Sequence, residues 1–488
     1  MAGSPLHLHN TLTRRVDAFV PLEPDGVRVY SCGPTVYSHQ HIGNMKPYVF
    51  SDTLRRVLRW KGYPVRQVVN ITDVGHLTSD EDEGEDKMEV GARREGRTIW
   101  EIAEYYTRLF LDDLAALRVL PPDVWCKATD HVPEMIAFAQ VLEQKGYCYR
   151  VPAGLYFDTS RAVDYGRLAR LNIAGQQEGA RVDAVEGRHN PSDFAVWRTT
   201  PAGEQRQMEW DSPWGKGAPG WHLECSVMSM KYLGPHFDIH TGGADHIPVH
   251  HVNEIAQSEA YLEDDQPWVP WWLHEEFINL KGAKMAKSTG DGLVLSELVD
   301  RGYHPLVYRY LLLQAHYRTQ VEFDWDALDG AKVGLRRLLD RLARSPRASA
   351  PEVRTYDEAA ATVATEAARA HLDAFDGAVS DDLNTARALA VVAAASRDDT
   401  LEDSDLAVLA RAFDAVLAIG LPDLEPSHLD LRRGDIEVDA ADVERLMQER
   451  AEARAARDFA RSDAIRDELQ ALGVDVEDAA SESTWRWA

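Results

Sequence analysis

The hydrophobic pattern of the chain alternates between a period of two and a period of about 3.6 residues, which separates predicted strands from predicted helices. Residues 27–30 predict a strand that ends near Cys32, and apolar residues spaced three and four apart from Val49 to Leu58 predict a helix that begins at residues 41–44. A turn rich in Gly and Pro separates the two elements. Because ligands of open α/β sheets bind outside the carboxyl ends of strands, this turn is the first candidate for a binding site.

The same pattern predicts the order of the remaining elements. Residues 98–101 have the form of a capping box before a helix that runs to about residue 118. Residues 121–220 are irregular, with many Gly and Pro residues and short predicted strands, and predict an insertion between two halves of a sheet. The other predicted elements are strands at 65–70, 237–240 and 277–280, a tight turn at 241–245, a helix at 249–262, helices from 295 onward, an Ala-rich helical bundle at 366–419, a linker at 421–426 and one long helix at about 440–472.

The composition is typical of a globular protein, with 44% hydrophobic and 27% charged residues in a chain of 488. No run of about eighteen apolar residues predicts a transmembrane helix. Residues 1–20 lack the apolar centre of a signal peptide, so we expect a cytoplasmic protein. Four cysteines in so long a chain do not make a disulfide framework.

The formal net charge is −27, from 53 basic and 80 acidic residues, which is unusual for a protein that binds a polyanion. Two interpretations remain open. Either the protein binds no nucleic acid, or a locally basic face lies on a surface adapted to high salt. No lysine follows Lys332, and a lysine-poor surface rich in carboxylates favours the second interpretation.

The turn after the first strand carries groups that suit a phosphate ligand. His41 and Asn44 can donate hydrogen bonds to phosphate oxygens, and Gly43 permits a nucleotide to approach the backbone closely. The positive end of the helix dipole lies at the same place, although a capped helix with a surface histidine would show the same four residues. The chain has neither the G-x-G-x-x-G nor the G-x-x-x-x-G-K-[ST] fingerprint, which argues against a dinucleotide oxidoreductase and a P-loop enzyme.

Four side chains that can bind a metal lie near this predicted site. Cys32 and Cys225 are predicted at strand–loop boundaries, and His250 and Glu254 lie four residues apart on one face of a helix. Together they form a tetrahedral set that suits zinc. Isolated cysteines are more often core residues, however, and the spacing is not that of a zinc finger. Spacing alone therefore leaves the metal open.

Two short motifs resemble the signatures of the class I aminoacyl-tRNA synthetases. Residues 41–44 read HIGN where these enzymes have HIGH, and residues 284–288 read KMAKS where they have KMSKS. Asn44 keeps a hydrogen-bond donor, and Ala286 leaves both lysines in place. Over nearly its whole length the chain also resembles the cysteinyl-tRNA synthetase family, in segments 32–37 (CGPTVY), 70–73 (NITD), 190–194 (NPSDF), 220–225 (GWHLEC), 237–240 (FDIH) and 250–258 (HHVNEIAQS).

The resemblance implies a role for each matched residue. One zinc ion is implied at Cys32, Cys225, His250 and Glu254. The implied residues around the amino acid are Thr72, Trp221, His240 and Asp245. ATP with magnesium is implied at His41, Gly43, Asn44, Lys284, Lys287 and Ser288, of which His41, Asn44, Lys284 and Lys287 are catalytic. Contacts with the tRNA anticodon are implied at Arg454, Asp463 and Asp478.

The implied activity is the joining of cysteine to tRNA-Cys through cysteinyl-adenylate, which is made from cysteine and ATP. Cysteine and serine differ by one atom, and a pocket that reads size or hydrogen bonds separates such pairs poorly. Zinc binds a thiolate better than a hydroxyl, so the metal would select cysteine and no editing domain is needed. Lys284 and Lys287 would neutralise charge on the leaving pyrophosphate, while His41 and Asn44 hold the triphosphate.

The resemblance implies an α/β fold, with the Rossmann-like parallel sheet of the class I synthetases, an insertion, a helical bundle and a small anticodon-binding domain, in a monomer. The expected divisions are 1–120 and 215–290 for the two halves of the catalytic domain, 121–214 for the insertion, 291–330 for a stem-contact region, 331–425 for the bundle and 426–488 for the anticodon-binding domain.

Two alternative functions remain: a related ligase that transfers cysteine to an aminosugar in mycothiol synthesis, and a non-catalytic paralog that binds tRNA. The segment from about residue 432 to 488 argues against the first, and the retained site residues argue against the second.

Overall fold

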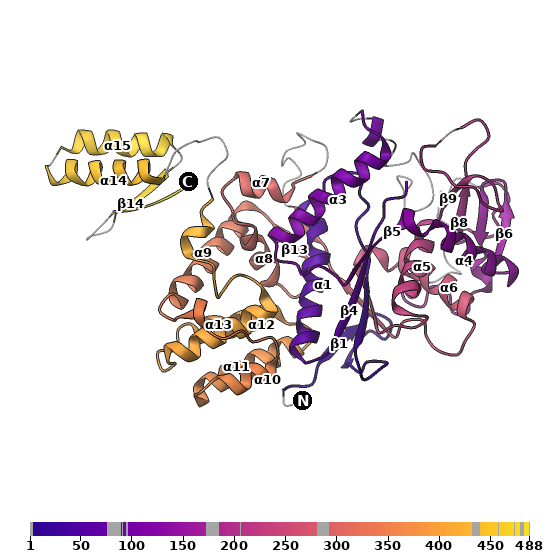
Figure 1. Ribbon diagram of the computed structural model, residues 1–488, viewed down its shortest axis with the longest axis horizontal. Helices are drawn as coiled ribbons and strands as arrows, with labels where there is room; N and C mark the ends of the chain where they lie inside the picture. The colour runs from indigo at the N-terminus through magenta and orange to yellow at the C-terminus, as the bar shows by residue number, and fades with distance from the viewer. Residues whose placement is uncertain are drawn as a thin grey trace.

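The fold is built around a parallel five-stranded sheet (Figure 1). The computed structural model describes residues 3–75, 89, 91–93, 96–171, 185–204, 206–280, 292–431, 440–456, 458–472, 474–478 and 483–487. The strands are β3 (Val27–Ser31), β4 (Val65–Ile71), β5 (Val124–Lys127), β10 (Ile239–Gly243) and β11 (Trp271–Glu275), in the spatial order β11-β10-β3-β4-β5. Strand order reverses between β3 and β10. Their carboxyl ends therefore define the switch point at which such sheets bind ligands.

Helices cover both faces of the sheet, because successive side chains of each strand point to opposite sides. Val29 packs into one hydrophobic core with α1 (Ile42–Trp60), and Tyr30 packs into a second core with α5 (Trp221–Leu233) and α6 (His250–Leu262). The first core also receives α3 (Ile99–Ala116). Thr98 and Glu101 form the predicted capping box of α3.

The insertion contains the short strands that the pattern of residues 121–220 predicted, paired as an antiparallel sheet, and a helix that the pattern did not indicate. The helix, α4 (Val132–Gln144), buries Met135, Phe138 and Leu142 against the second core. The sheet has the order β6-β7-β8-β9, with β6 (Cys148–Val151), β7 (Gly154–Phe157), β8 (Phe194–Thr199) and β9 (Gly217–Pro219). Strand β5 begins after residue 120 but pairs with β4, so the parallel sheet extends into the segment assigned to the insertion. The other domain boundaries stay predictions.

Helices predominate in the described residues after the sheet. They are α7 (Leu295–Asp300), α8 (Pro305–Leu313), α9 (Trp325–Leu342), α10 (Tyr356–Thr362), α11 (Glu366–Ser380), α12 (Thr385–Ala395) and α13 (Asp403–Leu417). Two short strands, β12 (Ile278–Leu280) and β13 (Val321–Phe323), pair in parallel beside them, and β1 (His7–Asn10) and β2 (Arg15–Ala18) form a hairpin near the N-terminus.

The predicted linker at 421–426 is instead part of the bundle. Leu421 and Leu424 are buried, and the guanidinium of Arg347 donates hydrogen bonds to both of their carbonyl oxygens, at 2.7 and 2.9 Å. A proline within this segment suggested a linker, but its leucines complete the apolar core.

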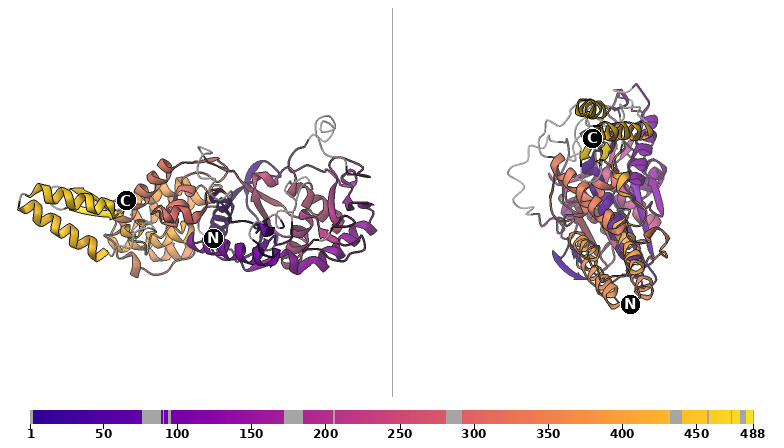
Figure 2. Two further views of the ribbon diagram at one scale, coloured as in Figure 1. Left: turned by 90° about the horizontal axis from the view of Figure 1, so that it is seen from above. Right: turned by 90° about the vertical axis from the view of Figure 1, so that its left-hand side faces the viewer.

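The C-terminal part is a helical hairpin followed by a β-hairpin, at the end of the molecule far from the insertion (Figures 1 and 2). Instead of one long helix at 440–472, the chain forms α14 (Ala440–Ala455) and α15 (Phe459–Ala471), and then β14 (Val474–Asp478) and β15 (Ser483–Trp487). A single helix would leave its apolar side chains in water. Folding back buries Val443 and Leu446 of α14 with Ile465 and Leu469 of α15.

Among the described residues, no helix is both long enough and apolar enough to cross a membrane. The four cysteines are buried, and none forms a disulfide.

Candidate active site

The loop after β3 is held against the end of β4 by a glycine. A Cβ at Gly33 would lie 1.5 Å from the carbonyl oxygen of Asn70, so only glycine fits there. The N–H of Gly33 donates to Oδ1 of Asn70 at 2.8 Å, and Thr35 pairs with Thr72. This close approach places Cys32 beside the residues that end β4, as the switch point requires.

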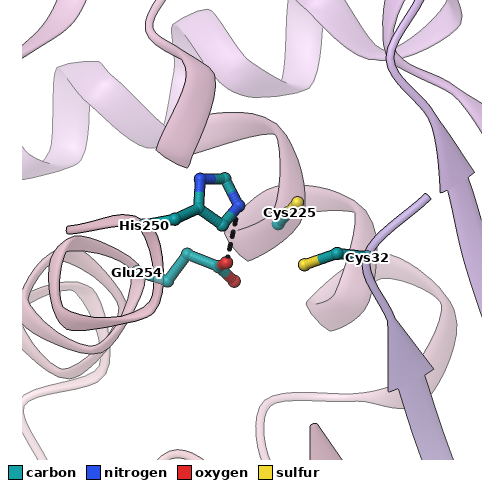
Figure 3. Close-up of side chains that lie close together, drawn as sticks. All are labelled: Cys32, Cys225, His250 and Glu254. Carbon is teal, nitrogen blue, oxygen red and sulfur yellow. Dashed lines mark ion pairs between the residues drawn. The ribbon is translucent and has the colours of Figure 1, made fainter. Parts of the chain in front are cut away.

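Four predicted metal ligands converge at this point (Figure 3). One ligand atom each of Cys32, Cys225, His250 and Glu254 lies within 4.8 Å of all the others. All four residues are buried, with exposures of 8%, 1%, 2% and 0%. Cys225 lies within α5 and not at a strand–loop boundary as predicted, because the helix begins at Trp221, immediately after β9. His250 and Glu254 share one face of α6, as their spacing indicated.

These donors fit a zinc ion by chemistry and by size. Two sulfurs, an imidazole and a carboxylate are all ligands of tetrahedral zinc, whose bonds of about 2.0–2.3 Å place neighbouring ligands roughly 3.3–3.8 Å apart. The observed separations, none of them above 4.8 Å, therefore need to change by no more than about 1.5 Å. A bound zinc ion would also compensate the buried negative charges of two thiolates and a carboxylate, which an apolar core alone would not accommodate.

The electrostatics of the group favour an ionised carboxylate. Burial would raise the pKa of Glu254, but His240 and His250 outweigh it and hold this pKa at about 2. Burial would lower the pKa of His250, but the charge of Glu254, 2.9 Å from Nε2, raises it to about 10. Burial raises the pKa of the Cys32 thiol. An ion bound here would replace the proton of His250 as the partner of Glu254.

Three further histidines, which the metal prediction missed, contact the ligand set. His240 Nε2 lies 2.9 Å from Glu254 Oε2, and His251 Nε2 lies 3.3 Å from Cys32 Sγ. His222 Nδ1 lies 3.0 Å from His250 Nδ1. His240 and His251 also form a second candidate group of metal donors with Cys32 and Glu254. The signal for His251 was its place next to His250, and the family resemblance already implied His240 beside the amino acid, whereas only the fold brings His222 to the ligand set.

The predicted phosphate-binding residues lie at the N-terminus of α1. His41 caps the helix, and its Nδ1 accepts a hydrogen bond from the N–H of Asn44 at 3.3 Å. Burial lowers the pKa of His41, so its imidazole is neutral at neutral pH. A Cβ at Gly43 would lie 2.9 Å from the His41 ring and 3.0 Å from Ile278. Gln40, which was not among the predicted residues, accepts a hydrogen bond from the side-chain amide of Asn44 at 2.9 Å.

The predicted residues Lys284, Lys287 and Ser288 lie outside the described residues. The described residues on both sides of 281–291 contact the start of α1. Ile278 of β12 packs against Gly43, and the N–H of Ile42 donates to the carbonyl oxygen of Leu293 at 2.7 Å.

The residues predicted around the amino acid lie beside the ligand set. Thr72 is buried, and its hydroxyl donates to Glu224 at 3.2 Å. The ring of Trp221 lies 4.4 Å from the ring of His250, and the buried ring of His240 stacks on Trp272 with centroids 4.5 Å apart. Asp245, on the short 3₁₀ helix Ala244–His246, is exposed.

The residues predicted to contact the anticodon lie on the C-terminal hairpins. Arg454 of α14 and Asp463 of α15 are exposed, and Asp478 ends β14. The structure adds Phe459, which is 64% exposed at the first position of α15, one helical turn before Asp463. An isolated aromatic residue between charged residues was the available signal.

Comparisons with known proteins agree with this geometry. Residues 18–333 match the family of class I (C) tRNA synthetase catalytic domains, and residues 440–486 match the cysteinyl-tRNA ligase anticodon binding domain. A solved structure of Mycobacterium tuberculosis methionyl-tRNA synthetase with methionyl-adenylate has the same fold, with a TM-score of 0.52 and 14% identity over 81% of this chain and 88% of that one. The family match over residues 18–333, together with the fold, identifies the chain as a class I aminoacyl-tRNA synthetase.

The curated relatives show which family within this class of synthetases the chain belongs to. Cysteine–tRNA ligase of Novosphingobium aromaticivorans is 50% identical over 99% of this chain and 97% of its own length. Cysteine–tRNA ligase 1 of Burkholderia lata is 50% identical over 97% of this chain and 95% of its own. This chain therefore belongs to the cysteine–tRNA ligase family.

Proposed function

We propose that this chain attaches cysteine to tRNA-Cys in two steps driven by ATP, and that it does so as a monomer in the cytoplasm. The observation that carries the proposal is the joint position of two sites at one switch point. Cys32 contributes to a metal-donor set, and nine residues later His41 opens the helix whose N-terminus suits phosphate. A reaction between an amino-acid carboxylate and ATP needs such adjacent sites, because positioning supplies much of its rate.

A zinc ion would be held by Cys32, Cys225, His250 and Glu254. As a Lewis acid it would bind the thiolate of the substrate cysteine and discriminate against the hydroxyl of serine. Thr72, Trp221 and His240 would line the rest of the amino-acid site. Asp245 would offer its exposed carboxylate to the substrate ammonium group.

In the first step, an oxygen of the cysteine carboxylate would attack the α-phosphorus of ATP, and the bond to the bridging oxygen would break to release pyrophosphate. His41, Gly43 and Asn44 would hold the phosphates at the positive end of α1. Lys284, Lys287 and Ser288 would stabilise the charge on the leaving pyrophosphate, which would carry magnesium. The contacts of Ile278 and Leu293 with the start of α1 support this, since they flank the lysine segment.

In the second step, the terminal ribose hydroxyl of the tRNA would attack the carbonyl carbon of cysteinyl-adenylate, and AMP would leave. Arg454, Asp463 and Asp478 would read the anticodon through hydrogen bonds to base edges. The match of residues 440–486 to an anticodon-binding domain disfavours the aminosugar ligase. The retention of all four metal donors together with His41 disfavours a non-catalytic paralog.

Two assays test this function. Purified protein is expected to catalyse ATP–pyrophosphate exchange that depends on cysteine, and to charge a tRNA-Cys transcript across a potassium chloride series. A transcript with a changed first anticodon base is the control and should charge at least tenfold more slowly. Exchange without charging would point to the aminosugar ligase, whereas binding of tRNA without exchange would point to the paralog. Charging that peaks at high salt would support the salt-adapted surface.

A further inference from the structure

A buried lysine behind the ATP site has a role that the proposed mechanism does not assign. Lys46 lies in the second turn of α1 and is 4% exposed. Its ammonium nitrogen lies 3.2 Å from Oε2 of Glu275, which is 3% exposed. It also donates to the carbonyl oxygens of Glu276, of Tyr317 at 3.4 Å and of Thr319 at 3.3 Å. Such a charge is tolerated in the interior only because every donor direction has a partner.

These contacts join elements that form two sides of the proposed ATP site. On one side, the first turn of α1 presents His41 and Gly43. On the other side, Glu275 ends β11 in register with Gly243, and the chain continues into β12, whose Ile278 packs on Gly43. The N–H of Glu276 donates to Tyr317 at 2.9 Å, so the root of β12 is itself fixed.

We propose that Lys46 and Glu275 are a positioning pair that sets the separation between the N-terminus of α1 and the β11–β12 segment, and thereby the affinity for ATP. The inference rests on the proposed function. Neither residue needs to touch substrate. Lys46 acts through the helix that carries His41, and Glu275 acts through the strand end beside Gly243.

The chemistry of the pair explains why an apolar side chain cannot replace it. An ammonium group has three donors on a flexible stem and can bridge a carboxylate and carbonyls from two segments. Without it, the buried carboxyl group of Glu275 would have no ammonium partner and would lie near the carboxylate of Asp245 in the proposed amino-acid site. Burial already raises the pKa of Glu275 to about 8 in spite of Lys46. Its remaining oxygen faces Gly243, since a Cβ there would lie 3.5 Å from Oε1.

The test compares Lys46→Met, Lys46→Arg and a matched control, Lys61→Met, in the full chain. Lys61 is also buried on α1 and pairs with Asp376 at 2.7 Å, but it caps the opposite end of the helix. Lys46→Met is expected to raise the KM for ATP in cysteine-dependent exchange at least tenfold. The KM for cysteine and the zinc content should stay within twofold. Lys46→Arg should restore most of the ATP affinity, because it keeps the charge.

The control separates positioning from loss of stability. Lys61→Met should lower the midpoint of thermal unfolding yet leave the KM for ATP within twofold. If Lys46→Met does not fold, Glu275→Leu takes its place, because it removes both side-chain oxygens beside Lys46, with an expected three- to tenfold rise in the KM for ATP. An unchanged KM for ATP, or an equal rise in the KM for cysteine with loss of zinc, would overturn the inference. Wild-type protein without cysteine-dependent exchange would instead overturn the proposed function, and the inference with it.

Discussion

Three of the four proposed metal ligands are each held by a neighbour that fixes the direction of the side chain. His240 orients Glu254, His251 lies against Cys32, and the side chain of Asn70 accepts from Cys225 Sγ at 3.9 Å. Such outer contacts typically change metal affinity by about 10- to 100-fold when they are removed. The ligand set is therefore held in place by its surroundings before an ion binds.

The first residue-scale prediction concerns Cys225. Cys225→Ser removes a soft thiolate from the set, so zinc content should fall from about one per chain to well below half. Cysteine-dependent exchange should fall at least 100-fold. Cys148→Ser is the matched control, because Cys148 is also a buried free thiol but lies in the insertion, outside both donor groups. Elemental analysis measures the zinc, and an active Cys225→Ser protein without zinc would disprove the metal assignment.

A second residue-scale prediction follows from the pKa of about 8 for Glu275, which burial raises above its usual value of 4.5. A raised carboxyl pKa contributes stability that is complete below about pH 4.5 and is lost as the pH rises towards 8. The amide of Glu275→Gln cannot ionise, so this variant keeps that contribution to stability as the pH rises. The stability of this variant relative to wild type should therefore increase between pH 5 and 8, by up to about 1.4 kcal/mol per pH unit.

Thermal unfolding midpoints of the two proteins at pH 5, 6, 7 and 8 measure this difference. A difference that is independent of pH, or that decreases as the pH rises, would show that Glu275 is ionised throughout this range.

At the scale of elements, the hydrophobic period of the sequence was enough to predict the type and approximate bounds of each long or regular helix and strand. It placed β3, α1, β4 and α3 close to their observed bounds. It missed β5, a four-residue strand that is specified by its pairing with β4 and not by its own pattern. It also merged α14 and α15, whose separation depends on burying Val443 against Ile465 across the turn.

The residues of the candidate site also fall into two groups: those that local sequence predicts and those that only the fold brings together. Local sequence placed His41 and Asn44 at a helix N-terminus, because a strand, a turn and a helix follow one another there. Cys32 and Cys225 are almost two hundred residues apart, and only the packing of α5 against β3 and β4 brings them together. Residue types alone left the metal open, and family resemblance selected the ligands. No pattern indicated that His274 would lie 2.7 Å from His251.

The element-scale prediction concerns the contact between the sheet and the helical bundle. Arg309 of α8 is fully buried, and it donates to Asp52 of α1 and to the carbonyl oxygens of Leu117 and Leu417. It thus ties α1 to the ends of α3 and α13. Arg309→Met leaves Asp52 with less compensating charge and two buried carbonyls without a donor, so we expect a loss of about 3–5 kcal/mol of unfolding free energy.

Thermal and urea unfolding measure this loss. Arg354→Met is the control, because its ion pair with Glu352 is exposed and should contribute no more than about 1 kcal/mol. Equal stability of the two variants would mean that Arg309 is not needed to join sheet and bundle.

At the scale of the whole molecule, the two proposed recognition sites are far apart. The C-terminal hairpins project from the helical bundle, at the opposite end from the insertion (Figure 2). Adenylate formation needs only the site at the sheet, whereas selection of tRNA needs the distant hairpins as well. A variant of the hairpins should therefore separate the two steps, in spite of the net charge of −27 that opposes RNA binding overall.

Phe459 is the residue best placed for this separation. Its ring is 64% exposed and is surrounded by the charged surface of α14 and α15, so it contributes little to the small core there. An exposed aromatic ring can stack on an unpaired base, which is worth about 1–3 kcal/mol. Phe459→Ala should therefore lower kcat/KM for tRNA charging by roughly 5- to 150-fold at constant salt. ATP–pyrophosphate exchange should not change, because the sheet and its ligands are untouched. Phe459→Trp keeps a stacking surface and should charge nearly as well as wild type. If Phe459→Ala charges tRNA normally, the ring is not part of the tRNA contact.

A parallel fall of exchange and charging would have another meaning. The hairpins would then support the catalytic site directly, and no variant of the hairpins would affect charging without also affecting adenylate formation.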